Sequence, residues 1–315
     1  MLLLPDIKTV EDYKPIYRNA NIWLPAMRVI CERHNLDVTQ LEFAPPGSHV
    51  VFKVKPDHYI KLFAPPWRKD FVSERIVLGK LSVQSDLLIP YLVAEGEIEN
   101  WQYIIMTAVE GMPLYNVWNS MDMSDREHIA ICCGKLMASL HSTQIEGLEA
   151  ISMDWPTFVK SQIQDCIAHI ERTDMSKQWV QSIKEFLKDP APLFEQDFQP
   201  VLLNADITDE HVLVSKHEGR WKLTGFIDFG DAMLGHPYYE FTAPGCTITR
   251  SSPELQRAML LAYGYSEDQL NSTMAMQLMA YTLIHRFLTV PDLLRLFGSH
   301  QPTNFDELRR ELWYF

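Results

Sequence analysis

Short runs of β-branched and aromatic residues dominate the first hundred residues. Two such runs, 48–54 (SHVVFKV) and 58–64 (HYIKLFA), are joined by a Pro-Asp pair typical of hairpin turns. Residues 89–109 read as two further strands around a polar turn, whereas residues 21–36 and 65–83 carry apolar side chains at helical spacing. The pattern predicts a β-rich region with one helix inserted between its strands.

The pattern turns helical after residue 107. Ser124 and Glu127 have the spacing of a capping box, and Ser252 precedes a proline as the cap of a further helix would. Residues 270–290 carry apolar residues at spacings of three and four, which predicts one core-facing helix and not a membrane span. The other predicted helices are 127–141, 156–171 and 177–187, and the predicted short strands are 200–206, 211–216 and 221–229.

The change of pattern near residue 107 predicts an α+β chain of two lobes, residues 1–106 and 107–315. At 315 residues the chain is longer than a usual single domain, and its 47% apolar and 22% charged residues are ordinary for a folded protein. Clefts between lobes commonly bind ligands. We expect a small β-rich N-terminal lobe, a larger and mainly helical C-terminal lobe, and a ligand site where they meet.

The charge balance and the cysteines narrow the class of protein. The 28 basic and 41 acidic residues give a formal charge of −13, which disfavours nucleic acid and anionic membranes and favours cationic partners. Acidity for solubility alone would give the same balance. The five cysteines show no metal-ligand spacing and no disulfide framework, and the apolar start MLLLPDIK is too short for a signal peptide. We expect reduced thiols and a cytoplasmic location.

One charged residue interrupts an apolar run and is a candidate for chemistry. Lys61 lies in the middle of the strand-like run 58–64, and Glu74 on the following predicted helix could pair with it. A lysine in such a run can also point to solvent from an edge strand, and glutamates are common on helix surfaces. The pair alone leaves both interpretations open.

Two aspartates follow predicted strands. Asp206 ends the predicted strand 200–206, and Asp228 ends the apolar part of the predicted strand 221–229. A carboxylate at a strand end can accept a proton from a substrate hydroxyl, and carboxylate oxygens are ligands that Mg²⁺ prefers. Aspartates are equally common in turns. Their order after Lys61 favours the chemical interpretation.

Taken together, these residues resemble the aminoglycoside phosphotransferase branch of the protein-kinase-like fold. The resemblance runs from about residue 40 to about residue 290, and it implies the bilobal fold of that family. The matching motifs are HYIKLF (58–63), FVSERIVLGKL (71–81), YIIMTAVEGMPL (103–114), LMASLH (136–141), NADITDEH (204–211), IDFGDA (227–232) and GHPYYEF (235–241).

The resemblance implies a role for each matching residue. Lys61, steadied by Glu74, would bind the phosphates of ATP or GTP, and Asp206 would be the catalytic base. Asp228 and His211 would hold Mg²⁺ or Mn²⁺. The remaining expected contacts are Met106, Thr107 and Ala108 for the nucleobase, and Gly47 and Ser48, within PPGSHVVF (45–52), as a cover over the phosphates.

Several positions depart from the family's pattern. Asn204 and Ala205 stand where the family has His-Gly before the base, and His211 replaces its metal-binding asparagine. Imidazole suits Zn²⁺ or Mn²⁺ better than Mg²⁺. Four interpretations follow: His211 binds the ion less directly, Asp209 assists, Mn²⁺ is preferred, or the protein does not catalyse. His236 replaces the aspartate of Gly-Asp-Pro, which predicts weaker support of the local loop.

The resemblance implies a phosphotransferase that acts on a hydroxyl of a small molecule. An acidic site would suit polycationic aminoglycosides, and relatives of the fold phosphorylate choline, sugars, macrolides and amino-acid derivatives, so a metabolic kinase is the alternative. A nucleotide-binding pseudokinase that serves as an interaction module is a third interpretation, and a protein kinase is disfavoured because no Ala-Pro-Glu segment follows IDFGDA. The acidic candidates for acceptor contacts, which could equally be solvated helix faces, are Glu240, Glu254, Glu267, Asp268 and Asp292.

Overall fold

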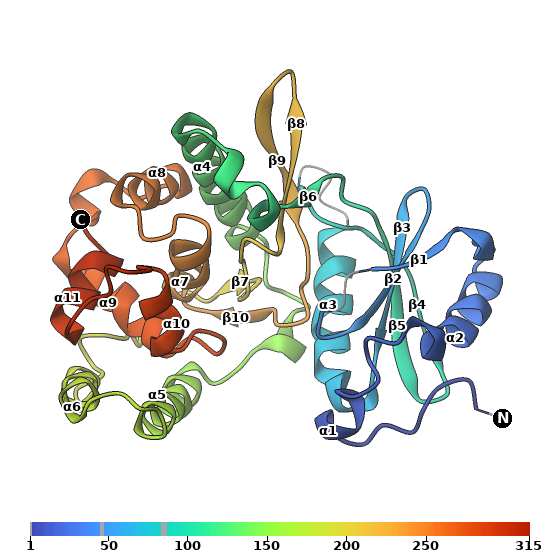
Figure 1. Ribbon diagram of the computed structural model, residues 1–315, viewed down its shortest axis with the longest axis horizontal. Helices are drawn as coiled ribbons and strands as arrows, with labels where there is room; N and C mark the ends of the chain where they lie inside the picture. Colours follow the sequence, from blue (N-terminus) through green and yellow to red (C-terminus); the bar gives the residue numbers. More distant parts are fainter. Residues whose placement is uncertain (1, 45–46, 83–86) are drawn as a thin grey trace. The chain divides into compact units, whose positions relative to one another are not determined.

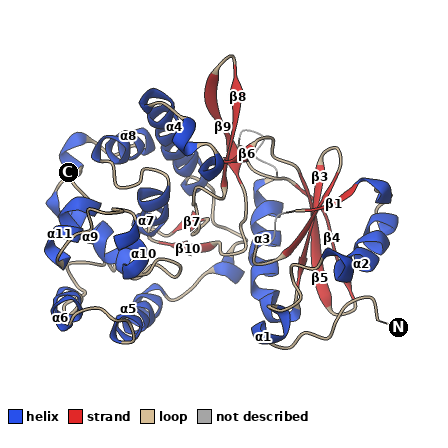
Figure 2. Ribbon diagram, in the orientation of Figure 1, coloured by secondary structure: helices blue, strands red, loops and turns tan. Residues whose placement is uncertain are grey.

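The computed structural model describes residues 2–44, 47–82 and 87–315. The chain divides into two compact units. The first comprises Met1–Val109 together with Ile227–Ala232, and the second comprises Glu110–Phe226 together with Met233–Phe315. The first unit is built on a five-stranded sheet and the second is mainly helical, which confirms the predicted α+β class (Figures 1 and 2).

The sheet of the first unit is antiparallel, with the strand order β1-β2-β3-β5-β4. The predicted turn between the last two strands is confirmed: Glu99 and Asn100 have φ values of 48° and 73°. Positive φ at both central residues is typical of a two-residue type I′ hairpin. The strands are β1 (Leu41–Phe43), β2 (Val50–Val54), β3 (His58–Phe63), β4 (Leu92–Ile98) and β5 (Trp101–Thr107).

Helices cover both faces of this sheet. α2 (Ala20–Arg33) places Trp23, Met27 and Ile30 in a core with one sheet face, and α3 (Arg68–Leu81) covers the other (Figure 1). Each such side chain, fully buried, contributes roughly 1.5–3 kcal/mol. A short helix, α1 (Val10–Tyr13), precedes α2, and single-turn helices lie at Val38–Gln40 and Pro65–Trp67.

The position of β3 decides between the two interpretations of Lys61. β3 is the central strand of the sheet, so it has no open edge. Side chains alternate between the faces of a strand: Ile60 and Leu62 join the core with α2, whereas Lys61 lies on the α3 side. Lys61 is 2% exposed. The solvent-facing interpretation is therefore wrong.

The second unit contains most of the helices and two small sheets, with strand orders β10-β7 and β6-β8-β9. Its helices α4 and α8 pack closely at Gly134, where a Cβ atom would lie 2.1 Å from the carbonyl oxygen of Met259. Its strands are β6 (Met112–Pro113), β7 (Val201–Leu203), β8 (Val212–His217), β9 (Arg220–Phe226) and β10 (Met233–Gly235). Its helices are α4 (Met123–His141), α5 (Trp155–Glu171), α6 (Lys177–Phe186), α7 (Pro237–Thr247), α8 (Pro253–Tyr263), α9 (Ser272–Leu283), α10 (Val290–Arg295) and α11 (Phe305–Leu312), with single-turn helices at Leu114–Asn116, Trp118–Ser120, Glu149–Ile151 and Glu267–Gln269.

Two helix predictions are wrong in detail. The predicted helix 270–290 is shorter: α9 ends at Leu283, residues 284–289 are not helical, and α10 begins at Val290 behind the capping box of Thr289 and Asp292. The N-cap of α4 is Asp122, whose side chain accepts a hydrogen bond from the main chain of Asp125, and not Ser124. The predicted cap of α8 at Ser252 is confirmed.

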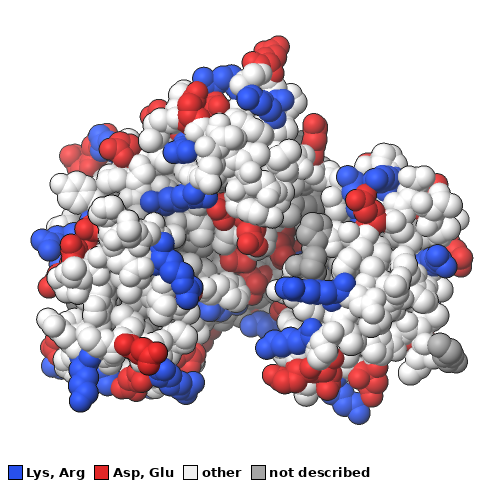
Figure 3. All heavy atoms as spheres, viewed as in Figure 1, with Lys and Arg blue, Asp and Glu red and all other residues white. Residues whose placement is uncertain are grey.

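Charged side chains of both signs are present on the surface. On the face drawn in Figure 3, lysine and arginine side chains are scattered among aspartate and glutamate. Within the part of the chain that the structure describes, no helix is both long and apolar enough to cross a bilayer.

Candidate active site

The first unit holds a buried trio of charged side chains. Lys61 Nζ lies 2.7 Å from Glu74 Oε2 on α3 and 2.9 Å from Asp228 Oδ1 in the returning segment 227–232. The side chains of Lys61 and Glu74 are 3% and 1% exposed, whereas that of Asp228 is 35% exposed. The structure thus brings together three predicted site residues, and Asp228 is the member that solvent or a ligand can reach.

The charge state of the trio follows from its geometry. Burial alone would lower the pKa of the Lys61 ammonium, but the carboxylates of Asp228 and Glu74 outweigh burial and raise this pKa above its ordinary value. Burial raises the pKa of the Glu74 carboxyl, and the Lys61 ammonium opposes that rise. Lys61 therefore stays a cation at neutral pH, held between two carboxylates.

Asp228 occupies a tight turn as well as an ion pair. Its φ is 64°, in the left-handed region, and its Oδ1 accepts a hydrogen bond from the Gly230 N–H at 3.2 Å. Aspartate tolerates this conformation better than most residues because its short polar side chain bonds locally. The turn fixes the direction of the carboxylate, and its hard oxygen atoms fit a divalent cation such as Mg²⁺.

The structure describes only part of the segment that was predicted to cover the nucleotide phosphates. Gly47 and Ser48 are exposed, and Pro45 and Pro46 of the same segment lie outside the described residues. The segment is anchored by the buried His49, whose Nε2 lies 3.3 Å from Asp70 Oδ2 on α3. This anchor was not predicted, because a histidine in a strand-like run gives no signal for its partner.

The predicted nucleobase contacts lie at the end of β5. The N–H of Thr107 donates to the Tyr91 carbonyl at 2.9 Å, and the N–H of Ala108 donates to the Asp57 carbonyl at 2.7 Å. Met106 pairs with strands on both sides. Donation from Thr107 or Ala108 to a nucleobase would require these bonds to break.

In the second unit, a loop after β7 carries the predicted base. The N–H groups of Asn204 and Ala205 donate to the two carboxylate oxygens of Glu240, at 2.8 and 3.0 Å. Asn204 Oδ1 accepts the N–H of Asp206 at 3.1 Å. Glu240 is 1% exposed and lies in the first turn of α7. It fixes the main chain immediately before Asp206.

Glu240 was predicted as an acceptor contact or a solvated residue, and both interpretations are wrong. Its Oε2 also lies 3.4 Å from His141 Nε2, and His141 Nδ1 lies 2.9 Å from the Tyr263 hydroxyl. Three other acidic candidates are engaged locally: Glu254 with Ser252, Glu267 with Arg257, and Asp292 with Thr289 and Arg295. These carboxylates cap helices or pair with neighbours.

Ala205 adopts a conformation that favours glycine. Its φ is 67°, which costs an alanine roughly 1–2 kcal/mol relative to the right-handed region. Glycine would remove this cost but would lose more backbone entropy on folding. We expect Ala205→Gly to stabilise the protein by about 0.5–1 kcal/mol, measured as a higher midpoint of thermal unfolding.

The same substitution inside a helix provides the control for Ala205→Gly. Ala138 lies within α4, where glycine is destabilising by roughly 0.5–1 kcal/mol. Ala138→Gly should therefore lower the unfolding midpoint. A fall of similar size in Ala205→Gly would contradict the strain inferred at Ala205.

His211 is directed at the predicted base. Its Nδ1 lies 2.7 Å from the Asp206 carbonyl oxygen and 3.3 Å from Asp206 Oδ2. Both partners are acceptors, so Nδ1 carries a proton and cannot bind a metal ion. Only Nε2 can do so. The carboxylate of the nearby Asp209 pairs with the guanidinium of Arg250 at 3.5 Å. That guanidinium lies over the ring of Trp118, 5.0 Å from the ring centroid.

His236 stands where the family has an aspartate, and it still supports the local loop by capping α7. Its Nδ1 accepts a hydrogen bond from the Tyr238 N–H at 3.1 Å, as a capping carboxylate would. The ring stacks on Tyr281, with centroids 5.2 Å apart. Burial lowers the pKa of His236 to about 4, so the ring is a neutral acceptor at physiological pH.

Comparisons with known proteins agree with this geometry. The protein-family model described as "Phosphotransferase enzyme family" matches residues 43–286. A sequence comparison with curated proteins gives no match. The predicted resemblance and the kinase-like fold are confirmed by this match and by similar solved structures.

Three solved structures illustrate the similarity. The GDP complex of wild-type aminoglycoside 2′-phosphotransferase-IIIa has a TM-score of 0.68 and 17% identity, covering 92% of this chain and 95% of that chain. Macrolide 2′-phosphotransferase MphH from Brachybacterium faecium has a TM-score of 0.60 and 17% identity, with coverages of 81% and 87%. The streptomycin-ATP-APH(2″)-IIa ternary complex has a TM-score of 0.58 and 16% identity, with coverages of 80% and 84%. At these identities the likeness shows the fold.

Proposed function

Because the chain belongs to the phosphotransferase enzyme family, we propose that it transfers the γ-phosphate of ATP or GTP to a hydroxyl group of a small molecule. The observation that carries the proposal is the buried Lys61, which lies within 3 Å of both Glu74 and Asp228. Burying a lysine between two carboxylates carries a desolvation penalty that can exceed the gain from their attraction, so such a group is weak evidence of a purely stabilising role. Similar structures contain GDP or ATP, which supports a nucleotide as the donor.

The electrostatics of the trio support a polyphosphate and a divalent ion together. One ammonium and two carboxylates carry a net negative charge, and a nucleotide would add more. Mg²⁺ or Mn²⁺, held by the exposed carboxylate of Asp228 and by phosphate oxygens, would neutralise charge that develops on the transferred group. Lys61 would donate hydrogen bonds to phosphate oxygens, and Glu74 would keep Lys61 in place.

Asp206 would act on the acceptor. Its carboxylate would orient the substrate hydroxyl and take its proton as the hydroxyl oxygen bonds to the γ-phosphorus. The bond from that phosphorus to the β–γ bridging oxygen breaks, and the nucleoside diphosphate leaves. The fixed main chain at Asn204 and Ala205 supports this role, since positioning supplies much of the rate enhancement in phosphoryl transfer.

We propose that His211 positions the base through Nδ1, which leaves Nε2 as the ring nitrogen that can bind the divalent ion. The donor Nδ1–H holds the main chain and the carboxylate of Asp206. A nitrogen ligand fits Mn²⁺ better than Mg²⁺. An asparagine has no pair of ring nitrogens on opposite sides with which to contact the base and the ion at once.

Replacing His211 separates these two roles. If the ring mainly positions Asp206, His211→Ala should lower kcat by roughly 10- to 100-fold, with little change in the metal concentration needed for half-maximal rate. His211→Asn, which can donate from its amide, should restore part of the loss. Steady-state rates across Mg²⁺ and Mn²⁺ titrations give both quantities. Full activity at raised metal concentration in His211→Ala would instead assign the ring to the ion.

The proposed function is tested by release of ADP or GDP from purified protein with Mg²⁺ or Mn²⁺. The acceptor panel contains aminoglycosides, macrolides, sugars, hydroxylated amines and hydroxy acids. Acceptor-stimulated release that disappears in Asp206→Ala would establish the kinase. Nucleotide binding without release for any acceptor would contradict the proposal and favour a binding module.

A further inference from the structure

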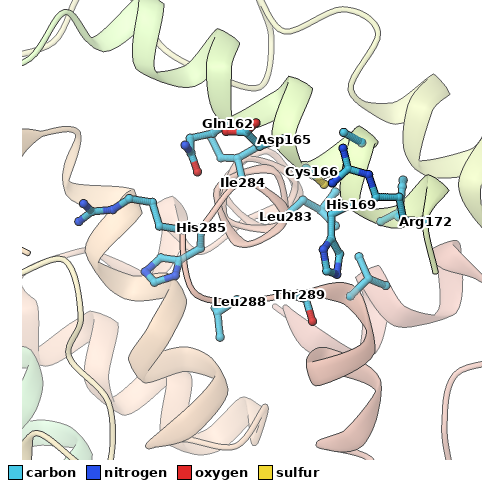
Figure 4. Close-up of a pocket in the computed structure, with 14 residues that line it drawn as sticks. Gln162, Asp165, Cys166, His169, Arg172, Leu283, Ile284, His285, Leu288 and Thr289 are labelled. Carbon is cyan, nitrogen blue, oxygen red and sulfur yellow. The ribbon is translucent and has the colours of Figure 1, made fainter. Parts of the chain in front are cut away.

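The second unit contains a cavity of about 290 Å³ between α5 and the turn that joins α9 to α10. Its α5 wall includes Gln162, Asp165, His169 and Arg172, which recur every three or four residues and so share one helix face. Figure 4 shows these side chains on α5, with His285, Leu288 and Thr289 contributed by the turn after α9. The cavity is at the small end of the usual range for a ligand pocket.

Cationic side chains outnumber anionic ones among the residues that line this cavity. The charged residues that line it are Arg172, Arg286 and Asp165, so cations exceed anions in a chain whose formal charge is −13. Arg172 is exposed, and its side chain forms no ion pair or hydrogen bond with any described residue. An arginine fork without a protein partner is suited to a carboxylate or a phosphate.

A buried donor lies in the same wall. His285 is 4% exposed, and its Nδ1 accepts the Phe287 N–H at 3.3 Å, so the proton is on Nε2. The ring N–H donates to the main-chain carbonyl of Ala205. Burial lowers the pKa of His285 to about 3, so the ring is neutral at physiological pH.

The cavity is linked to the loop that carries Asp206. The ring of His285 lies against the main chain of Ala205, the residue before Asp206. The same ring stacks on Tyr239, with centroids 4.8 Å apart, and the Tyr239 hydroxyl accepts the N–H of Arg286 at 3.1 Å. Tyr239 precedes Glu240, which binds the main chain of the Asp206 loop. His285 in the wall of the cavity therefore contacts the loop that carries the proposed base.

We propose that this cavity binds an anionic oxygen group of the acceptor, a carboxylate or a phosphate monoester, so that the acceptor is a hydroxylated anion and not a polycation. The inference rests on the proposed function, whose site it deepens. Arg172 supplies the charge. An aminoglycoside would require acidic partners, and Asp165 is the one carboxylate in the described lining.

Binding can be measured without turnover, which separates this inference from the proposed function. Isothermal titration of the full-length protein would use four probes: gluconate, glucose 6-phosphate, glucose and kanamycin. The first two distinguish a carboxylate from a phosphate, glucose is the neutral match for both, and kanamycin is the polycation. At least one anionic probe should bind at least tenfold more tightly than glucose or kanamycin.

The matched variants are Arg172→Gln and Lys160→Gln. Both remove one positive charge from an exposed position on α5, but Lys160 does not line the cavity. Loss of a charge-assisted contact should weaken the anionic probe about tenfold in Arg172→Gln and leave it unchanged in Lys160→Gln. Equal weakening in the two variants would show a long-range electrostatic effect of the protein's charge and would overturn the inference.

Three other outcomes would also overturn the inference: tighter binding of kanamycin, equal binding of glucose, or no binding of either anion at millimolar concentration. None of them affects the proposed phosphotransfer, which is decided by nucleotide release and its dependence on Asp206. Conversely, anion binding that depends on Arg172 in a protein that releases no nucleoside diphosphate would refute the kinase and leave an anion site.

Discussion

Asp206→Asn should lower kcat by roughly 10²- to 10⁴-fold, the usual contribution of a positioned acid or base. The amide is nearly the same size as the carboxylate and can still accept a hydrogen bond from His211 Nδ1, so the loop should keep its shape. Nucleotide affinity should stay within about twofold, because the loss is in transition-state stabilisation and not in donor binding. Steady-state kinetics with the acceptor found by the panel, together with nucleotide titration, measure both.

Glu210→Gln is the control for this experiment. Glu210 is an exposed carboxylate in the same loop, so the substitution removes one charge at nearly the same place. Its kcat should match that of the unmodified protein. Turnover retained in Asp206→Asn would remove Asp206 from the mechanism, and equal losses in both variants would indicate a loop-wide electrostatic effect.

Lys61→Met should abolish transfer and also destabilise the fold. Without the ammonium, the Glu74 carboxylate is buried at 1% exposure without a compensating charge, and breaking a buried pair in this way costs roughly 3–5 kcal/mol. Urea denaturation should show this loss as a lower midpoint. Nucleotide affinity should fall as well, since Lys61 is the proposed phosphate ligand.

The double variant Lys61→Met with Glu74→Leu separates stability from function. Replacing both members of a buried pair by apolar residues of similar size is often neutral for stability. We expect the double variant to regain most of the lost stability and none of the activity. A single Lys61→Met variant as stable as the unmodified protein would contradict the buried ion pair.

The local elements could be predicted from the sequence because their signals are local. The strands of the β-rich region follow from β-branched and aromatic runs, and the cap at Ser252 follows from the proline after it. Whether Lys61 faces solvent or core could not be predicted. That depends on β5 pairing with β3, which makes β3 the central strand, and this pairing joins segments far apart in the sequence.

The predicted residues of the candidate site were identified by their order along the chain, but their orientations were not. His211 was predicted by position, whereas the direction of Nδ1 toward Asp206 depends on the shape of the loop. Glu240 was misread because a glutamate in the first turn of a helix is ordinarily a solvated residue that favours the helix dipole. Its burial against Asn204 and Ala205 depends on how α7 packs against the end of β7.

The first unit is discontinuous along the chain, and this has a consequence for protein synthesis. Its five strands are complete once the ribosome has translated Thr107, yet Asp228 belongs to the returning segment 227–232. Until that segment emerges, the nascent sheet has only Glu74 to pair with Lys61. A fragment that ends at Val109 would lack the solvent-reachable carboxylate of Asp228. Translation through much of the helical unit therefore precedes assembly of the charged trio.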